Sequence, residues 1–182
     1  MMISAPVDVE GSGNVHFNVT GVFELAANSN MTVTGAAVQR LVFETETDIQ
    51  LSPSSYVNGN HALVTVESPA KRALRLGGVG GPGEVVIDPS VASRMSGSRL
   101  VFGGPSTDTL VVTNCSYTGT AFEVDLMALG QEEASVTIEG SGLTSFMNSQ
   151  VQIDAGKDVT ISANLTIGGR GTIVGNSGCT GN

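Results

Sequence analysis

Apolar side chains recur along the chain in short groups in which every second residue is apolar, which is the spacing of a β-strand with one buried face. Glycine or a short polar turn separates nearly every group, and the groups begin about 8 to 15 residues apart, as in all-β domains. The groups lie at Val15–Val19, Met31–Val33, Leu41–Phe43, Ile49–Leu51, Leu63–Val66, Leu74–Leu76, Val85–Ile87, Leu100–Phe102, Leu110–Val112, Phe122–Leu126, Val136–Ile138, Val151–Ile153, Val159–Ile161, Leu165–Ile167 and Ile173. The pattern therefore predicts an all-β chain. Helix is expected only as short pieces of one or two turns, at Glu24–Asn30, Ser90–Gly97 and Leu126–Ala134.

Two arrangements of these strands are open. One is a parallel β-solenoid, in which each coil carries two or three short strands and stacks on the coil before it. The other is a β-sandwich. The strands are shorter and more numerous than a sandwich usually needs, and two-residue hairpin turns are nearly absent, with Asn58-Gly59 the one candidate. The solenoid is therefore the first prediction, with about six or seven coils if two strands make a coil.

The stretch after Lys157 shows what a solenoid requires of the side chains. Alternate apolar residues should point into the core, namely Val159, Ile161, Ala163, Leu165 and Ile167. The polar residues between them should point outward, namely Thr160, Ser162, Asn164 and Thr166. The glycines that follow, Gly168, Gly169 and Gly171, are expected at a corner where a side chain would clash.

Composition narrows the class of protein. The 182 residues suffice for a single domain with a real core, but Trp is absent and aromatic residues make up only 4% of the chain. This scarcity favours a narrow core repeated along an axis. We expect residues 1–182 to form a single domain, and the end of the chain, Gly175–Asn182, suggests a segment of a longer protein.

The net charge of −9 excludes some partners. Nucleic acid is not expected as a partner, because its phosphates require a basic surface. An anionic lipid surface is disfavoured for the same reason. A membrane span is not expected either, because the chain has no apolar run of about 20 residues.

The segment Phe43–Ile49 holds the sharpest acidic pattern. Glu44, Glu46 and Asp48 alternate with other residues, so on a strand all three carboxylates would face one side. Such a group could hold Ca²⁺ or raise one pKa for acid catalysis on a glycan, and a solvated sheet face is the third interpretation. Calcium is the one cofactor for which the sequence offers a candidate site. No catalytic residue is predicted, and the pair Glu123 and Asp125 is expected to be solvated on an outward face.

Cysteines and sequons carry little chemistry. Cys115 and Cys179 could be two buried thiols or a disulfide between neighbouring repeats, and no His or Cys stands at metal-ligand spacing to them. The sequons that would accept an N-linked glycan begin at Asn18, Asn30, Asn114 and Asn164.

Arg72 and Arg75 belong to a basic block with Lys71, and the side chains of this block are expected to be solvated.

Two segments resemble known repeats. Ile153–Gly169, "IDAGKDVTISANLTIGG", is similar to the repeats of filamentous-haemagglutinin-type adhesins. Val111–Gly119, "VVTNCSYTG", resembles strand ends of pectin-lyase-like repeat surface proteins, and Asn176–Asn182 looks like a degenerate copy of it. The middle of the chain, including Ser68–Gly83, is similar to neither. The resemblance implies a right-handed parallel β-helix displayed outside the cell.

These observations give two functional expectations. The first is an extracellular or cell-surface segment, structural or adhesin-like, that contacts a glycan or a cell-surface protein and accepts further coils or protomers on its ends. The alternative is a carbohydrate-active enzyme or tailspike-like segment, a polysaccharide lyase or hydrolase, on the same fold. A third reading, a β-sandwich binding module, goes with the alternative fold. Whether the chain is an enzyme stays open, with a non-enzymatic role favoured.

Overall fold

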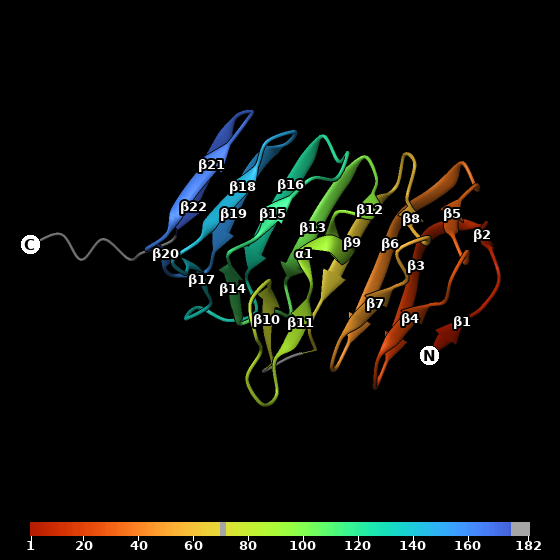
Figure 1. Ribbon diagram of the computed structural model, residues 1–182, viewed down its shortest axis with the longest axis horizontal. Helices are drawn as coiled ribbons and strands as arrows, with labels where there is room; N and C mark the ends of the chain where they lie inside the picture. The colour runs from red at the N-terminus through yellow and green to blue at the C-terminus, as the bar shows by residue number, and fades with distance from the viewer. Residues whose placement is uncertain (70–71, 176–182) are drawn as a thin grey trace, which may run out of the picture.

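The computed structural model describes residues 1–69 and 72–175, and nearly all of their regular structure is β-strand (Figure 1). The chain passes through three strand faces in a fixed order, and we call one such passage a circuit. The first face holds, in spatial order, β1 (Met2–Ile3), β4 (Phe23–Leu25) and β7 (Ile49–Leu51), then β11 (Val85–Ile87), β10 (Ala73–Leu76), β14 (Thr109–Thr113), β17 (Ser135–Glu139) and β20 (Val159–Ile161).

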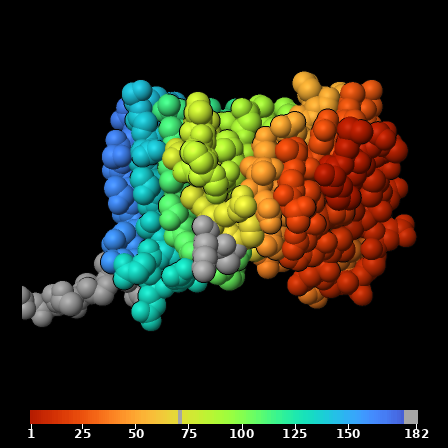
Figure 2. Space-filling model, turned by 90° about the horizontal axis from the view of Figure 1, so that it is seen from below, coloured from red at the N-terminus to blue at the C-terminus, as the bar shows by residue number. Residues whose placement is uncertain are grey.

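The other two faces follow the same order along the molecule. The second face holds β2 (Val7–Val9), β5 (Met31–Val33), β8 (Val57–Asn58) and β12 (Met95–Ser96), then β15 (Ser116–Tyr117), β18 (Leu143–Phe146) and β21 (Asn164–Ile167). The third face is one seven-stranded sheet of β3 (Ser12–Val19), β6 (Ala37–Thr45), β9 (Leu63–Glu67), β13 (Arg99–Gly104), β16 (Glu123–Ala128), β19 (Gln150–Ala155) and β22 (Gly171–Gly175). Figure 2 shows successive parts of the chain following one another along the long axis.

All pairs of strands in the described residues are parallel, and nearly every strand pairs with the strand of the same face one circuit later. The prediction of an all-β chain is confirmed. The antiparallel pairing that the sandwich alternative requires is absent from the described strands. Of the two or three strands expected in each coil, a circuit carries three, and those on the second face are only two to four residues long.

One hydrophobic cluster runs through the space between the faces. It is built from alternate residues of each strand, as in β19, where Val151, Ile153 and Ala155 are buried while the residues between them are partly exposed. The core is aliphatic over most of its length. Aromatic rings pack in two places, in the first circuits, where the Phe23 and Phe43 rings meet edge to face at 5.0 Å between centroids, and in later circuits, where the Tyr117 and Phe146 rings stack at 6.0 Å.

The fourth circuit departs from this regularity. Its first-face part consists of two parallel strands, and β11 returns to lie between β7 and β10. The helix α1 (Pro89–Ala92) then precedes β12, with Asp88 as its N-cap. On the second face no strand pairing joins β12 to β15. Two hydrogen bonds connect these circuits instead, one donated by Thr118 N to Ser93 Oγ at 3.0 Å and one donated by the Tyr117 hydroxyl to Met95 O at 3.4 Å.

Helix predictions were largely wrong. Of the three segments expected to form one or two turns of helix, only the one around Ser90 contains a helix, α1. Glu24 instead lies in β4 and Leu126 in β16, because each pairs with strands of neighbouring circuits. In the described part of the chain, no helix is long and apolar enough to cross a membrane.

The stretch after Lys157 mostly follows its prediction. Val159, Ala163, Leu165 and Ile167 pack against the core, whereas Ile161 is 41% exposed because β20 is the outermost strand of its sheet. Gly168 and Gly169 lie at the expected corner, where an added Cβ would clash with backbone, whereas Gly171 begins β22. A Cβ on Gly168 would lie 1.8 Å from Met147 O.

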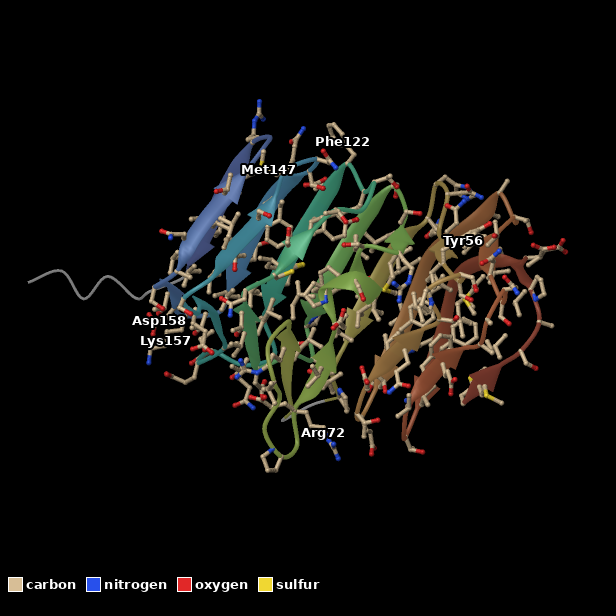
Figure 3. All side chains as sticks on the ribbon, viewed as in Figure 1. Tyr56, Arg72, Phe122, Met147, Lys157 and Asp158 are labelled. Carbon is tan, nitrogen blue, oxygen red and sulfur yellow. The ribbon has the colours of Figure 1, made fainter. Side chains whose placement is uncertain are left out.

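Two phenylalanines test whether the core is where the structure places it. Phe102 is completely buried, whereas Phe122 is 67% exposed and points away from the molecule in Figure 3. We expect Phe102→Ala to lower the free energy of unfolding by about 3–5 kcal/mol, through lost burial and the cavity left behind. The control Phe122→Ala should stay within about 0.5 kcal/mol of the wild type. Urea unfolding measures both, and equal losses would contradict this assignment of the core.

Candidate functional site

The outer side of the third face carries the candidate site. Parallel pairing places residues of neighbouring strands in rows across this sheet, and in one row Arg40, Leu63, Arg99 and Glu123 follow one another. The adjacent row contains Thr65, Val101 and Asp125. Polar side chains from separate circuits therefore meet on one surface, although 23 to 36 residues of chain separate each residue of the first row from the next.

A hollow of about 240 Å³ lies across these rows, and we call it the third-face groove. It is lined by Arg40, Leu63, Arg99, Val101, Gly104, Pro105, Asp125 and Met127. Apolar side chains and two guanidinium groups thus share one concave surface. This mixture of an apolar lining and a few placed polar groups is typical of ligand sites.

The turn after β13 helps to form the groove. Gly103 has a φ of +88° and lies so close to β16 that an added Cβ would be 1.9 Å from Met127 O. This conformation lets the chain leave the sheet and fold over Glu67, on whose side chain Gly104 packs. Ser106 Oγ donates a hydrogen bond of 3.0 Å to Glu67 Oε2. Pro105 thereby becomes part of the groove lining.

Arg40 and Glu67 form the first ion pair of the groove. Arg40 Nη2 contacts Glu67 Oε1, and Arg40 Nε donates to Thr65 Oγ1 at 3.0 Å. The carboxylate of Glu67 is nearly buried, and it is held by Arg40 from one side and by Ser106 from the other. The pair is fixed in position, while the outer edge of the guanidinium remains partly exposed.

Arg99 and Asp125 form the second ion pair. Arg99 Nη2 contacts Asp125 Oδ2, and Arg99 Nε lies 3.8 Å from Glu123 Oε2. Asp125 is completely buried, and neither of its carboxylate oxygens meets hydrogen-bond geometry with a donor in the described residues. Burial raises the pKa of Asp125 to about 6 despite the attraction of Arg99, and the charges of Glu123 and Asp154 raise it further.

This arrangement suits binding of a ligand better than catalysis. The exposed edges of two arginines can donate to oxygens of a ligand, and the aliphatic lining can pack against its C–H groups. A carboxyl group with a pKa near 6 could also donate a proton, which is what a general acid requires. Each buried carboxylate, however, already has an arginine as its partner.

The acidic cluster expected in Phe43–Ile49 is not brought together on one strand. β6 ends at Thr45, which turns inward and donates to Gly21 O at 2.7 Å. Glu44 pairs with His16 at 3.2 Å, Glu46 lies 3.6 Å from Arg72, and Asp48 accepts a hydrogen bond from Gln50 at 3.0 Å.

Burial raises the pKa of Asp48. No group of His, Cys, Asp or Glu suited to a metal ion occurs in the described residues. The calcium site stays a prediction.

The other predicted residues are scattered over the surface and core. Asn18, Asn114 and Asn164 are exposed, and Asn30 is half-buried. Cys115 is buried, and burial raises the pKa of its thiol to about 12. Cys179 lies outside the described residues, as do Asn176–Asn182 and Lys71, so the disulfide is not tested.

Two charged residues were placed wrongly from the sequence. Asp125 was expected to be solvated, but its neighbours in the row and the turn after β13 cover it. Arg75 was expected in a solvated block, but it is largely buried between Glu84 at 2.8 Å and Glu139 at 3.2 Å. The sequence carries no signal that singles out Arg40 and Arg99. Their partners lie one circuit away, and only the pairing register identifies those partners.

The raised pKa of Asp125 gives a test by pH. The folded protein binds this proton more tightly than the unfolded chain, whose pKa is near 3.8. The contribution of Asp125 to the free energy of unfolding therefore falls as the pH rises from about 4 to about 6, by on the order of 2 kcal/mol in total. Asp125→Asn should remove this part of the pH dependence.

Urea unfolding between about pH 4 and about pH 7 measures the slope. Glu123→Gln is the matched control, because it removes a partly exposed carboxylate that lies beside the same arginine. If Asp125→Asn and the wild type change in parallel across this range, the assignment is wrong.

Comparison with known proteins adds no family to this geometry. No family model, no curated protein and no solved structure matches the chain. Function is therefore argued from the third-face groove, its two ion pairs and the arrangement of the strands.

Proposed function

We propose that the chain is a segment of a right-handed parallel β-helix that is displayed outside the cell and contacts a glycan or a cell-surface protein. The observation that supports this most is the parallel pairing of strands one circuit apart along the described chain. Right-handedness is proposed because connections between parallel strands of one sheet are right-handed in about 98% of cases.

The stiffness of a stacked parallel segment suits a protein that displays a binding surface. The internal strands of the third face have both edges paired, and all three faces share one core, so the chain resists bending and presents its outer faces with little loss of conformational entropy on binding. The outermost strands, such as β3 and β22 of the third face, keep one edge free. Further circuits or protomers would bind there, since unpaired parallel edges accept another strand.

The third-face groove is the proposed contact surface. Its arginines are held by Glu67 and Asp125, so their free N–H groups are oriented before a ligand arrives. The floor between them is formed by Leu63 and Val101. A saccharide offers both hydroxyl oxygens for the arginines and C–H faces for the floor, which favours a glycan over a purely charged ligand.

The second candidate function is a carbohydrate-active enzyme that uses the same groove. Asp125 supports it, because a carboxyl group with a pKa of about 6 suits a general acid near neutral pH. Glu67 is the other buried carboxylate next to the groove. Glycoside hydrolysis normally needs two carboxyl groups facing the scissile bond. Here each faces an arginine instead, and we therefore rank binding first.

The experiment measures binding and cleavage on the same panel of acidic and neutral polysaccharides, with and without Ca²⁺. We expect binding to at least one glycan, no release of reducing or unsaturated ends, and no dependence on Ca²⁺. Leu63→Glu places a charge on the groove floor without removing an ion pair, and it should weaken binding at least tenfold, or by about 1.4 kcal/mol. Val79→Glu is the control, because Val79 is 93% exposed on a loop of the first face.

The outcomes separate the candidates. Release of ends from one substrate, lost in Asp125→Asn, would replace the display proposal by the enzyme. Binding that survives Leu63→Glu would move the contact away from the groove. No binding to any glycan would remove the glycan and leave a cell-surface protein as the partner to test.

A further inference from the structure

A second hollow lies where the second face is interrupted. It has a volume of about 360 Å³ and is lined by Tyr56, Asn58, Ser93, Arg94, Ser96 and Thr120, and we call it the second-face hollow. Its residues come from three consecutive circuits, at the place where no strand pairing joins β12 to β15. Its volume falls within the range of small-molecule sites, about 300–1,000 Å³. It shares no residue with the third-face groove.

Among the described residues that line the second-face hollow, Arg94 alone is charged. Its Nη2 donates to Leu51 O at 2.5 Å, which anchors one end of the guanidinium. Its Nε is buried and has no hydrogen-bond partner in the described residues. A guanidinium carries five N–H donors, so the N–H groups of Arg94 other than the buried Nε and the one bonded to Leu51 remain to donate to an anionic oxygen, and their planar arrangement suits a carboxylate.

The neighbouring polar groups also present donors. The Asn58 Oδ1 already accepts from Asn60 N at 2.9 Å, so the amide NH₂ is the side of that group left for a ligand. Ser93 Oγ accepts from Thr118 N at 3.0 Å, which leaves its O–H to donate. A set of donors around one arginine selects a ligand rich in acceptor oxygens.

Tyr56 supplies the apolar part of the hollow. Its backbone is fixed on both sides, since its N–H donates to Asn30 Oδ1 at 3.3 Å and its carbonyl accepts from Met31 N at 3.0 Å. The side chain is nonetheless 44% exposed (Figure 3), so its ring offers a free face to the C–H groups of a ligand. A ring of this kind beside a cation and hydroxyl groups fits a saccharide unit better than an inorganic anion.

The charge of the whole protein sets a limit on that ligand. The net charge of −9 repels densely charged polyanions, whereas one carboxylate needs only the one guanidinium. Asp88, the carboxylate nearest along the chain, is the N-cap of α1, where it accepts from Ser90 N at 2.7 Å. The hydrogen bond from Ser90 lowers the pKa of Asp88 most, and the charge of Arg94 lowers it further.

We propose that the second-face hollow binds a sugar acid, meaning a saccharide unit with a single carboxylate. The carboxylate pairs with Arg94, the hydroxyl oxygens accept from Asn58 and Ser93, and a C–H face of the ring packs on Tyr56. This site is independent of the third-face groove, so either one can be wrong without the other.

The test titrates the isotopically labelled chain with glucuronic acid and with N-acetylneuraminic acid while amide resonances are recorded. Glucose tests the need for the carboxylate, and acetate tests the need for the sugar. We expect saturable shifts at Asn58, Ser96 and Thr120 with at least one of the two acids. Glucose and acetate should bind at least about tenfold more weakly.

Variants locate the site. Arg94→Gln removes the charge, and Tyr56→Ala removes the ring while leaving the backbone bonds in place. Each should weaken binding at least about tenfold, and the control Arg72→Gln, at the far corner beside Glu46, should leave it unchanged. Should Arg94→Gln fail to fold, Tyr56→Ala alone decides.

Four results would overturn the proposal. They are the absence of saturable shifts with both acids, equal binding of glucose, equal binding of acetate, and unchanged binding in Tyr56→Ala. Equal binding of acetate would reduce the site to a simple anion site, and equal binding of glucose would make it a neutral saccharide site. Neither result would bear on the third-face groove.

Discussion

Parallel pairing of the backbone between successive circuits is the constraint on which the rest of the structure depends. It places equivalent residues about 4.8 Å apart across a face, so that each outward side chain meets its neighbours one circuit before and after it. Arg40 reaches Glu67 and Arg99 reaches Asp125 for this reason, although both pairs are distant in sequence. Through the same pairing, each strand fixes the position of the strand one circuit later.

Close stacking of rows also explains how an outward residue becomes buried. On the third face, Thr65 and Asp125 point away from the core yet have no exposed surface. Their neighbours on the adjacent strands fill the space beside them, and the turn after Gly103 covers part of the face. A carboxylate in such a place loses water on every side, and one arginine does not fully replace that hydration. The raised pKa of Asp125 follows from this position.

These relations decide how much of the molecule could be predicted from the sequence. Strands such as the one at Val151–Ile153 could be predicted, because the alternation of apolar and polar residues within a strand is a local property of the sequence. The two-residue strand β8 was not, since two residues carry no period. Phe23 was missed because a helix-like composition follows it, and only pairing with β7 makes it a strand residue. The burial of Asp125 depends on which residues lie one circuit away, and a loose repeat does not fix that register.

The two hollows lie where the repeat changes rather than where it is regular. A strictly regular stack offers flat faces, and ligand selectivity requires a concave surface. The third-face groove arises where the chain leaves β13 after Gly104, and the second-face hollow arises where α1 and β12 interrupt the pairing. Both changes belong to the fourth circuit, which also contains the extra first-face strand. That circuit includes most of Ser68–Gly83, the part of the chain that resembles neither known repeat. The irregular circuit thus shapes both hollows, while the circuits on either side supply part of their lining.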